Sequence, residues 1–285
     1  MLASAAVGSR RRLKRLYSLG GSAWEFATLR GDARRRILSL DPSLYTVGLA
    51  NESTREAWLK KVLSELPPGA RLLDAGAGEC AHKKYCEHLH YVSQDLTKYD
   101  GKGEVGLHMG AWDTSRIDIV SDITDIPAPD ASFDAILCAE VLEHITDPTL
   151  ALAELARLLK PGGTLIVTAP FCSFTHFAPY HYATGFSRYF YEHHLRRIGF
   201  DIVELVENGS FFEFTAMQVR MAEPMAQRYA GERLSILERF AVQVVLSMLE
   251  RFSTADKDSN ELLNYGIFVR ATKRPPAVAS VKSSS

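Results

Sequence analysis

Short apolar runs separated by polar stretches dominate the middle of the chain. Five of them follow one another, at residues 71–76, 91–95, 117–122, 133–140 and 163–170. They are mostly continuous rather than strictly alternating, which is typical of strands that are covered on both faces. The pattern therefore predicts a parallel sheet with helices outside it.

Helical periodicity fills several of the gaps between these runs. The clearest helix is expected over residues 148–160, and Ser187 is a candidate N-cap for a helix that stops at Gly199. Two further strands are expected at residues 200–206 and 265–272.

The stretch between these last two strands also has helical periodicity. Its apolar positions repeat every three or four residues from Leu237 to Phe252. This stripe indicates a helix that packs within the fold, and a homodimer contact through residues 234–252 or a membrane-surface helix are the alternatives.

The chain divides by composition and pattern into three parts. Residues 1–66 are expected to form a basic, helical N-terminal arm or cap, and residues 67–274 the main domain, with a helical insertion at about 209–263. The tail, residues 275–285, has a composition that predicts disorder.

Charge changes this picture only at the N-terminus. Residues 10–36 hold nine Lys or Arg against two acids, whereas the rest of the chain holds 24 basic and 32 acidic residues. We interpret the arm as a solvated basic segment, with a mitochondrial presequence as the alternative because the first 24 residues resemble one. The four cysteines form no CxxC pair, which favours a reducing compartment and hence the cytoplasm. No apolar run is long enough to predict a membrane span.

A glycine-pinched turn follows the first strand. Gly76 and Gly78 would let the backbone approach a ligand, and a following helix would direct its free N–H groups there. The turn fits the loose GxGxxG/A dinucleotide pattern, with Asp95 about twenty residues on. Asp74, just before the turn, favours a cationic ligand without phosphates instead.

Five motifs in order extend this signal: "LLDAGAGE", "QD", "SDITDIP", "FDAILCAEVLEHI" and "LLKPGGTLIVTAP". On these residues, roughly 71–170, the chain resembles the class I S-adenosylmethionine-dependent methyltransferases, in the small-molecule branch called type 11. Cys80 stands where the family pattern has a third glycine. The resemblance implies a Rossmann-like α/β fold, with a seven-stranded, mainly parallel sheet and helices on both faces.

The resemblance also implies where S-adenosylmethionine binds. The turn after Asp74 would line the methionine end of the cofactor, Asp95 would accept from the ribose hydroxyls, and Asp122 would take the adenine amino group. Carboxylates suit these donors because charged acceptors make strong hydrogen bonds. The full implied set is Asp74, Ala75, Gly76, Ala77, Gly78, Asp95, Leu96, Asp122, Ile123, Ala139 and Glu140.

Residues 80–90 carry two cysteines and three histidines, which raises the question of a metal site. His82 and Cys86 would share one helix face, but the spacing matches no common zinc arrangement. The resemblance makes this stretch the first helix beside the cofactor. We therefore expect no metal.

Candidate acceptor-side groups follow the fourth and fifth strands. A hydroxyl acceptor would need a general base, and His144 and His176 are the first candidates, with Glu143 and Tyr180 behind them. His181 lies in the same loop. The alternative is that these residues only shape a helix start and a surface loop.

We therefore expect methyl transfer to a small-molecule or sugar-like acceptor, at oxygen. The loop "CAEVLEHI" lacks the Asn/Asp-Pro-Pro-aromatic and Pro-Cys sequences of base methyltransferases, so nucleic acid is not the expected partner. A non-catalytic scaffold with a cofactor fold and an NAD-dependent oxidoreductase are the alternatives.

Overall fold

The computed structural model describes residues 42–99, 106–107 and 112–276. The basic arm as far as residue 41 and the tail from residue 277 lie outside the described residues. The chain divides into a sheet unit, residues 49–214 and 256–285, and a helical unit, residues 1–48 and 215–255. The domain boundaries expected from the sequence stay predictions.

The sheet unit is built on seven strands in the order β3-β2-β1-β4-β5-β7-β6. Strands β1 to β5 pair in parallel, and β7 runs antiparallel to both β5 and β6. This confirms the expected mainly parallel, seven-stranded Rossmann-like α/β fold. The strands are β1 (Arg71–Ala75), β2 (His90–Asp95), β3 (Ile119–Val120), β4 (Phe133–Ala139), β5 (Leu159–Pro170), β6 (Phe200–Asn208) and β7 (Gly266–Lys273).

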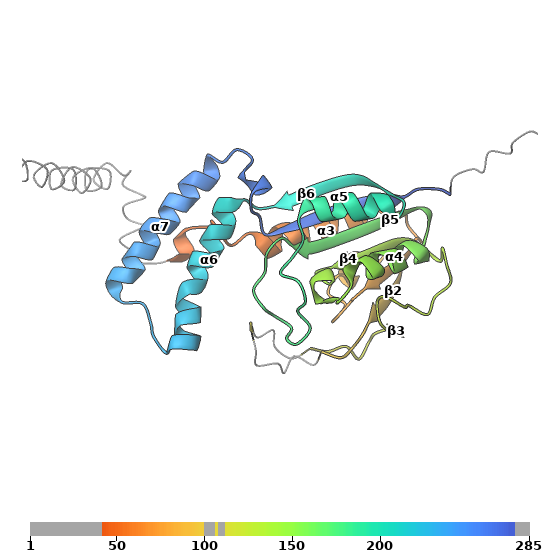
Figure 1. Ribbon diagram of the computed structural model, residues 1–285, viewed down its shortest axis with the longest axis horizontal. Coiled ribbons are helices and arrows are strands. Elements are labelled where there is room, and N and C mark those ends of the chain that lie inside the picture. The colour runs from red at the N-terminus through yellow and green to blue at the C-terminus, as the bar shows by residue number, and fades with distance from the viewer. Residues whose placement is uncertain (1–41, 100–105, 108–111, 277–285) are drawn as a thin grey trace, which may run out of the picture. The chain divides into compact units, whose positions relative to one another are not determined.

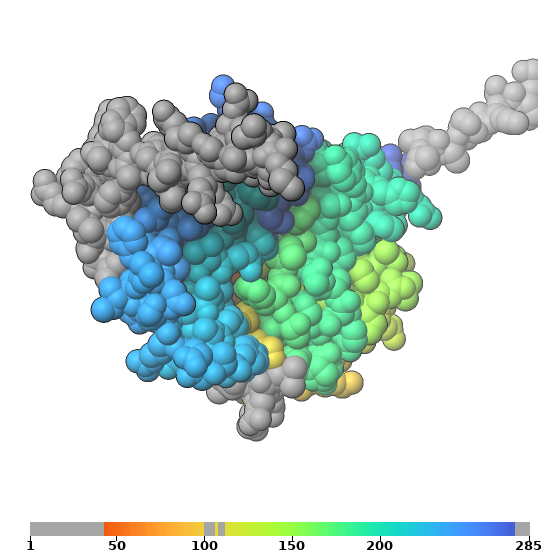
Figure 2. Space-filling model, turned by 60° about the vertical axis from the view of Figure 1, so that its left-hand side comes forward, coloured from red at the N-terminus to blue at the C-terminus, as the bar shows by residue number. Residues whose placement is uncertain are grey.

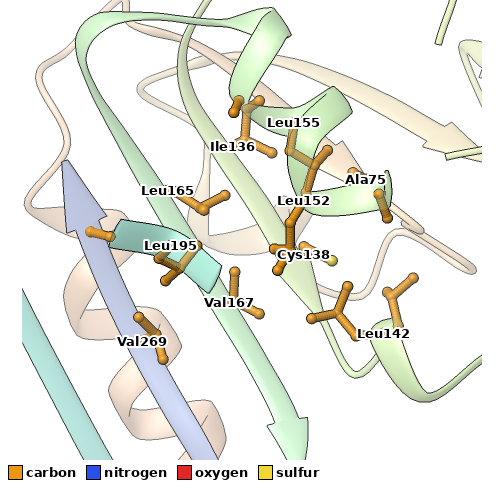
Figure 3. Close-up of a cluster of buried hydrophobic side chains, with 14 of the residues drawn as sticks. Ala75, Ile136, Cys138, Leu142, Leu152, Leu155, Leu165, Val167, Leu195 and Val269 are labelled. Atoms are coloured by element: carbon orange, nitrogen blue, oxygen red, sulfur yellow. The ribbon is translucent and has the colours of Figure 1, made fainter. Parts of the chain in front are cut away.

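Helices cover both faces of this sheet (Figure 1). One face packs on α4 (Pro148–Leu158) and α5 (Arg188–Arg197), and the other on α3 (Asn51–Ser64). Neighbouring residues of one strand therefore enter different cores: Ile136 and Cys138 lie in the first cluster (Figure 3) and Leu137 in the second. Burial on both faces is the reason that the strands read as continuous apolar runs.

The helices of the sheet unit begin near the expected residues. Asp147 caps α4, because its side chain accepts hydrogen bonds from two backbone N–H groups of the first turn, and Pro148 occupies the first helical position. Ser187 is the N-cap residue of α5, although its side chain makes no capping bond. Helix α3 lies within the segment that the sequence assigned to the arm, and its Trp58 stacks on Phe268 of β7, with ring centroids 5.2 Å apart.

The prediction of a helix directly after the glycine turn is wrong. The described chain between β1 and β2 contains only a 3-10 turn, η2 (Lys83–Tyr85). Cys80 has φ of +58°, the left-handed conformation that a glycine would adopt more easily. A left-handed residue interrupts an α-helix, so helical N–H groups are not available at this turn.

In the helical unit, the described residues include η1 (Pro42–Leu44) and α7 (Ile236–Thr254). Helix α6 (Phe211–Met225) begins in the sheet unit and ends in the helical unit, where the π-turn η4 (Ala226–Ala230) follows it. Ser235 and Glu238 form a reciprocal capping box at the start of α7.

The surface formed by α7 is drawn in blue in Figure 2. Leu246 and Leu249 are buried, whereas Leu237, Val244 and Met248 of the expected apolar stripe are exposed. No helix among the described residues is long and apolar enough to cross a membrane. The remaining 3-10 turns, η3 (Leu142–His144) and η5 (Ser259–Glu261), belong to the sheet unit.

Candidate functional site

The glycine turn after β1 is held closely against β2. The N–H groups of Gly76 and Ala77 both donate to the Gln94 carbonyl, at 2.8 and 2.9 Å. Gly76 has φ of +77°, and a Cβ there would lie 2.5 Å from the Val141 side chain. A Cβ on Gly78 would lie 2.8 Å from the Trp112 ring. Both positions therefore need glycine.

Asp74, the acid that precedes this turn, is buried rather than open to solvent. Its side chain lies at the end of β1, and the Tyr91 hydroxyl of β2 donates to its Oδ2 at 2.5 Å. Burial raises the pKa of the Asp74 carboxyl. The Asp74 carboxylate therefore joins β1 to β2 through Tyr91. Tyr91 could not be identified from the sequence, because the pairing of β1 with β2 creates this contact.

Asp95, at the end of β2, is half-buried and faces the turn. One carboxylate oxygen accepts from Gly78 N–H at 3.0 Å, and the other accepts from Thr97 N–H at 2.7 Å. Each oxygen retains a second lone pair. The carboxylate therefore joins β2 to the turn and can still accept hydrogen bonds from a ligand. Leu96, the other residue expected at this end of β2, follows Asp95 directly.

Asp122 follows β3 and is exposed. Its Oδ1 accepts from Thr124 N–H at 2.9 Å and from the Thr124 hydroxyl at 2.8 Å, a turn of the Asx type. The next side chain, Ile123, is only 4% exposed and belongs to the core. Any contact between Ile123 and a ligand therefore involves its backbone.

Glu140, just after Ala139 and the end of β4, adopts φ of +55°. Its Oε2 pairs with Arg55 Nη1 of α3 at 3.0 Å, and its Oε1 accepts from the Thr168 hydroxyl of β5 at 2.9 Å. A non-glycine residue in this region is strained, and such strain collects at functional sites. Sequence reasoning missed Arg55, which lies 85 residues away in the chain.

An aromatic cluster lies beside the glycine turn. It consists of Tyr99, Trp112 and Phe177, whose ring centroids are 4.2 to 6.3 Å apart. Phe177 also lies 4.8 Å from the His144 ring. The cluster therefore connects the turn with the acceptor-side residues, and of its members only Phe177 lies in a loop that the sequence singled out.

The acceptor-side candidates do come together. Glu143 and His144 lie in η3, and His176 reaches them from the loop between β5 and α5. The Glu143 Oε1 atom is 3.7 Å from His144 Nε2 and 3.9 Å from His176 Nε2. Tyr180 contributes its backbone carbonyl, which accepts from His144 Nδ1 at 2.5 Å.

Burial shifts the protonation of this group. It raises the pKa of the Glu143 carboxyl well above its ordinary value and lowers the pKa of His144 to about 4. The pKa of His181 is also lowered by burial, and its ring centroid lies 4.9 Å from that of His176. The imidazole of His144 is therefore neutral near pH 7.

Residues 73–167 match the model of a family described as a methyltransferase domain. Among curated relatives, a demethylmenaquinone methyltransferase from Clavibacter sepedonicus is 33% identical over 150 residues, 51% of this chain and 56% of that protein. A ubiquinone biosynthesis O-methyltransferase from Xanthomonas axonopodis pv. citri (strain 306) is 35% identical over 109 residues, 36% of this chain and 44% of that protein. The chain thus spans about half the length of the curated relatives it matches.

Solved structures with a similar fold include a SAM-dependent methyltransferase from Archaeoglobus fulgidus, with 16% identity and a TM-score of 0.49 over 78% of this chain and 94% of that one. The [4+2]-cyclase SpnF is another, with 19% identity and a TM-score of 0.47 over 80% of this chain and 84% of that one.

The matched residues begin in β1 and end in β5, and they include the glycine turn, Asp95 and Glu140. Over residues 73–167, the chain is therefore similar to the methyltransferase domain of class I S-adenosylmethionine-dependent methyltransferases.

Proposed function

We propose that the protein transfers a methyl group from S-adenosylmethionine to an oxygen atom of a small-molecule or sugar-like acceptor. The observation that carries this proposal is the position of the Asp95 carboxylate. It faces a turn whose two glycines are closed in by Val141 and Trp112.

The residues present fit the cofactor. Asp95 has lone pairs left for the ribose hydroxyls, and Asp122 is exposed at the end of the neighbouring strand for the adenine edge. The carboxylates of Asp74 and Glu140 favour a ligand with a sulfonium and an ammonium group, and the aromatic cluster favours the sulfonium by cation–π contact. The cofactor would supply an activated methyl carbon. The chain would align the acceptor with it, and alignment can lower a barrier by about 7–11 kcal/mol at most.

The acceptor side rests on Glu143, His144, His176 and Tyr180, which we propose as the catalytic group. His144 Nδ1 donates to a carbonyl, so its Nε2 carries the lone pair and can accept a proton. His176 is arranged in the same way, because its Nδ1 lies 2.8 Å from the Phe174 carbonyl. The names of the relatives, which include an O-methyltransferase of ubiquinone biosynthesis, support oxygen as the acceptor atom.

Calorimetry tests the cofactor. We expect S-adenosylmethionine and S-adenosylhomocysteine to bind the full chain and NAD not to bind. Binding of NAD alone would refute the proposal in favour of an oxidoreductase.

Radiolabelled methyl transfer to a panel of phenols, catechols and sugars tests the reaction. Labelled product from a member of the panel supports the enzyme. Tight cofactor binding with no product from any member would instead support the scaffold alternative.

The remaining partner and location proposals are narrower. We propose a homodimer through α7, supported by the exposed Leu237, Val244 and Met248. Met248→Glu should shift the mass measured by light scattering toward the monomer.

We also propose a cytoplasmic location, supported by four cysteines that are all free. Nucleic acid is not a proposed partner.

A further inference from the structure

Three imidazole rings from two separate segments of the chain meet beside η3. We call His144, His176 and His181 the histidine cluster. One ring nitrogen from each lies within 4.8 Å of the corresponding nitrogens of the other two. His144 ends η3, whereas the other two lie in the loop between β5 and α5. Imidazole nitrogen is the most common protein ligand of transition metals, so the clustering itself is chemically informative.

A buried carboxylate lies against this cluster. Glu143 is 0% exposed, and neither of its carboxylate oxygens has a hydrogen-bond partner among the described residues. Its Oε1 faces the Nε2 atoms of His144 and His176 at 3.7 and 3.9 Å. A buried carboxylate without partners is costly unless a proton or a cation balances it. A cation held between this carboxylate and the histidine nitrogens would supply that balance.

Backbone carbonyls fix which nitrogen of each ring is available. The Nδ1 atoms of His144 and His176 lie 2.5 and 2.8 Å from the carbonyls of Tyr180 and Phe174. A carbonyl only accepts, so both Nδ1 atoms donate and both lone pairs are on Nε2, the atom that faces Glu143. Metal-ligating histidines are typically oriented by such a second hydrogen bond. The two ring nitrogens of His181 have no hydrogen-bond partner among the described residues.

We propose that the histidine cluster and the Glu143 carboxylate bind one divalent transition-metal ion. Three nitrogen ligands and one oxygen suit Zn²⁺, Co²⁺, Fe²⁺ or Mn²⁺ better than Mg²⁺ or Ca²⁺, which prefer oxygen. Ligands on one tetrahedral zinc lie roughly 3.3 Å apart. The separations of up to 4.8 Å therefore have to shorten by about 1 Å or more when the ion binds.

This proposal differs from the expectation that the chain holds no metal, which was argued from residues 80–90. It also changes how the proposed function would work: histidine nitrogens that ligate the ion do not accept a proton, and the cation among the acceptor-side residues would instead lower the pKa of an acceptor hydroxyl. This catalytic role rests on the proposed methyl transfer. The binding of the ion does not rest on it.

Metal titration of the full chain without a polyhistidine tag tests the site. After chelator treatment, Co²⁺ should give a visible absorption band that saturates at one equivalent, Zn²⁺ should abolish it, and millimolar Mg²⁺ should not. Zn²⁺ should also raise the Tm of the parent. No band and no rise in Tm would overturn the proposal.

Matched variants locate the site. Glu143→Gln, which keeps the shape of the side chain, and His176→Ala should weaken Zn²⁺ binding at least tenfold. His90→Ala removes an exposed histidine of residues 80–90 and should leave it unchanged. Equal binding by Glu143→Gln, His176→Ala and the parent would overturn the assignment, and so would loss of binding in His90→Ala alone.

S-adenosylmethionine calorimetry on the same samples separates the two proposals. Glu143→Gln should bind the cofactor within about threefold of the parent, which also shows that the variant is folded. If the parent binds Zn²⁺ but no S-adenosylmethionine, the metal site stands and the proposed function fails. If it binds the cofactor but no metal, only the metal site fails.

Discussion

Asp95→Ala separates the structural role of this carboxylate from its proposed role in cofactor binding. In the structure, the Asp95 carboxylate accepts from two backbone N–H groups, those of Gly78 and Thr97, at 3.0 and 2.7 Å. A hydrogen bond to a charged group contributes about 1.5–3 kcal/mol. Because Asp95 is half-buried, we take the lower end for each of the two bonds and expect the free energy of unfolding to fall by about 3 kcal/mol in total. Urea denaturation measures this loss.

The same change should weaken S-adenosylmethionine binding by more than tenfold. The proposed ribose hydroxyls lose a charged acceptor, and a loss of about 1.5–3 kcal/mol corresponds to a factor of roughly ten to 150 in Kd. Calorimetry at a temperature where the variant is fully folded measures Kd. An unaltered Kd would remove Asp95 from the cofactor site.

A matched control separates the two effects. Asp118 is exposed and accepts from the N–H and the hydroxyl of Ser93, at 2.9 and 2.8 Å, so it also ties a side chain to β2. Asp118→Ala should lower stability and leave the Kd for S-adenosylmethionine unchanged. If Asp118→Ala weakened the cofactor as much as Asp95→Ala, general loosening of β2 would explain both results and the reasoning would fail.

Three further changes probe the site and the core. Gly76→Ala places a Cβ 2.5 Å from Val141 at a φ of +77°, so urea denaturation should show a loss of about 1–3 kcal/mol, and a neutral result would contradict the close packing. In metal-free protein, burial raises the pKa of the Glu143 carboxyl. The stability that the protonated carboxyl contributes is therefore present below pH 4.5 and is lost as pH rises through its folded pKa. The Tm of Glu143→Gln should exceed that of the parent increasingly above pH 4.5. Glu154 has the opposite sign, because hydrogen bonds from Arg157 lower its pKa: Glu154→Gln should lower Tm at neutral pH, and the difference should disappear as pH falls through the folded pKa. Parallel Tm profiles for parent and variants would refute both pH predictions.

The sheet could be predicted because nearly every strand carries its own signal. A strand such as β4, with Leu137 in one core and Ile136 in the other, is apolar at successive positions whatever its neighbours are. The glycine turn could also be predicted, because Gly76 and Gly78 have positive φ, a conformation that glycine adopts more easily than other residues. These features depend on a few adjacent residues, and the sequence displays them directly.

Other features depend on contacts between distant residues. The helix expected after the turn does not form because Cys80 has a left-handed φ, and this φ could not be predicted from the residue type. On α7, the spacing of apolar residues predicts that the stripe from Leu237 to Phe252 is the buried face of the helix. In the structure, however, Leu237 is 76% exposed, and Gln243, a polar residue outside the stripe, is only 1% exposed. The contacts Tyr91–Asp74 and Arg55–Glu140 exist only once the strands and α3 are in register.

The sequence identified the members of the histidine cluster one by one, but it did not predict that they lie together. His144 and His176 are 32 positions apart, and no motif spacing joins them. What brings the loop to η3 is backbone hydrogen bonding: the N–H groups of Tyr182 and Ala183 both donate to the Glu143 carbonyl, at 2.9 and 3.1 Å. Such bonds use atoms that every residue has, so they leave no trace in the sequence. Because these bonds hold the loop to Glu143 itself, the contacts that create the cluster also place its histidines beside a carboxylate that is, among the described residues, the one buried carboxylate without a hydrogen-bond partner.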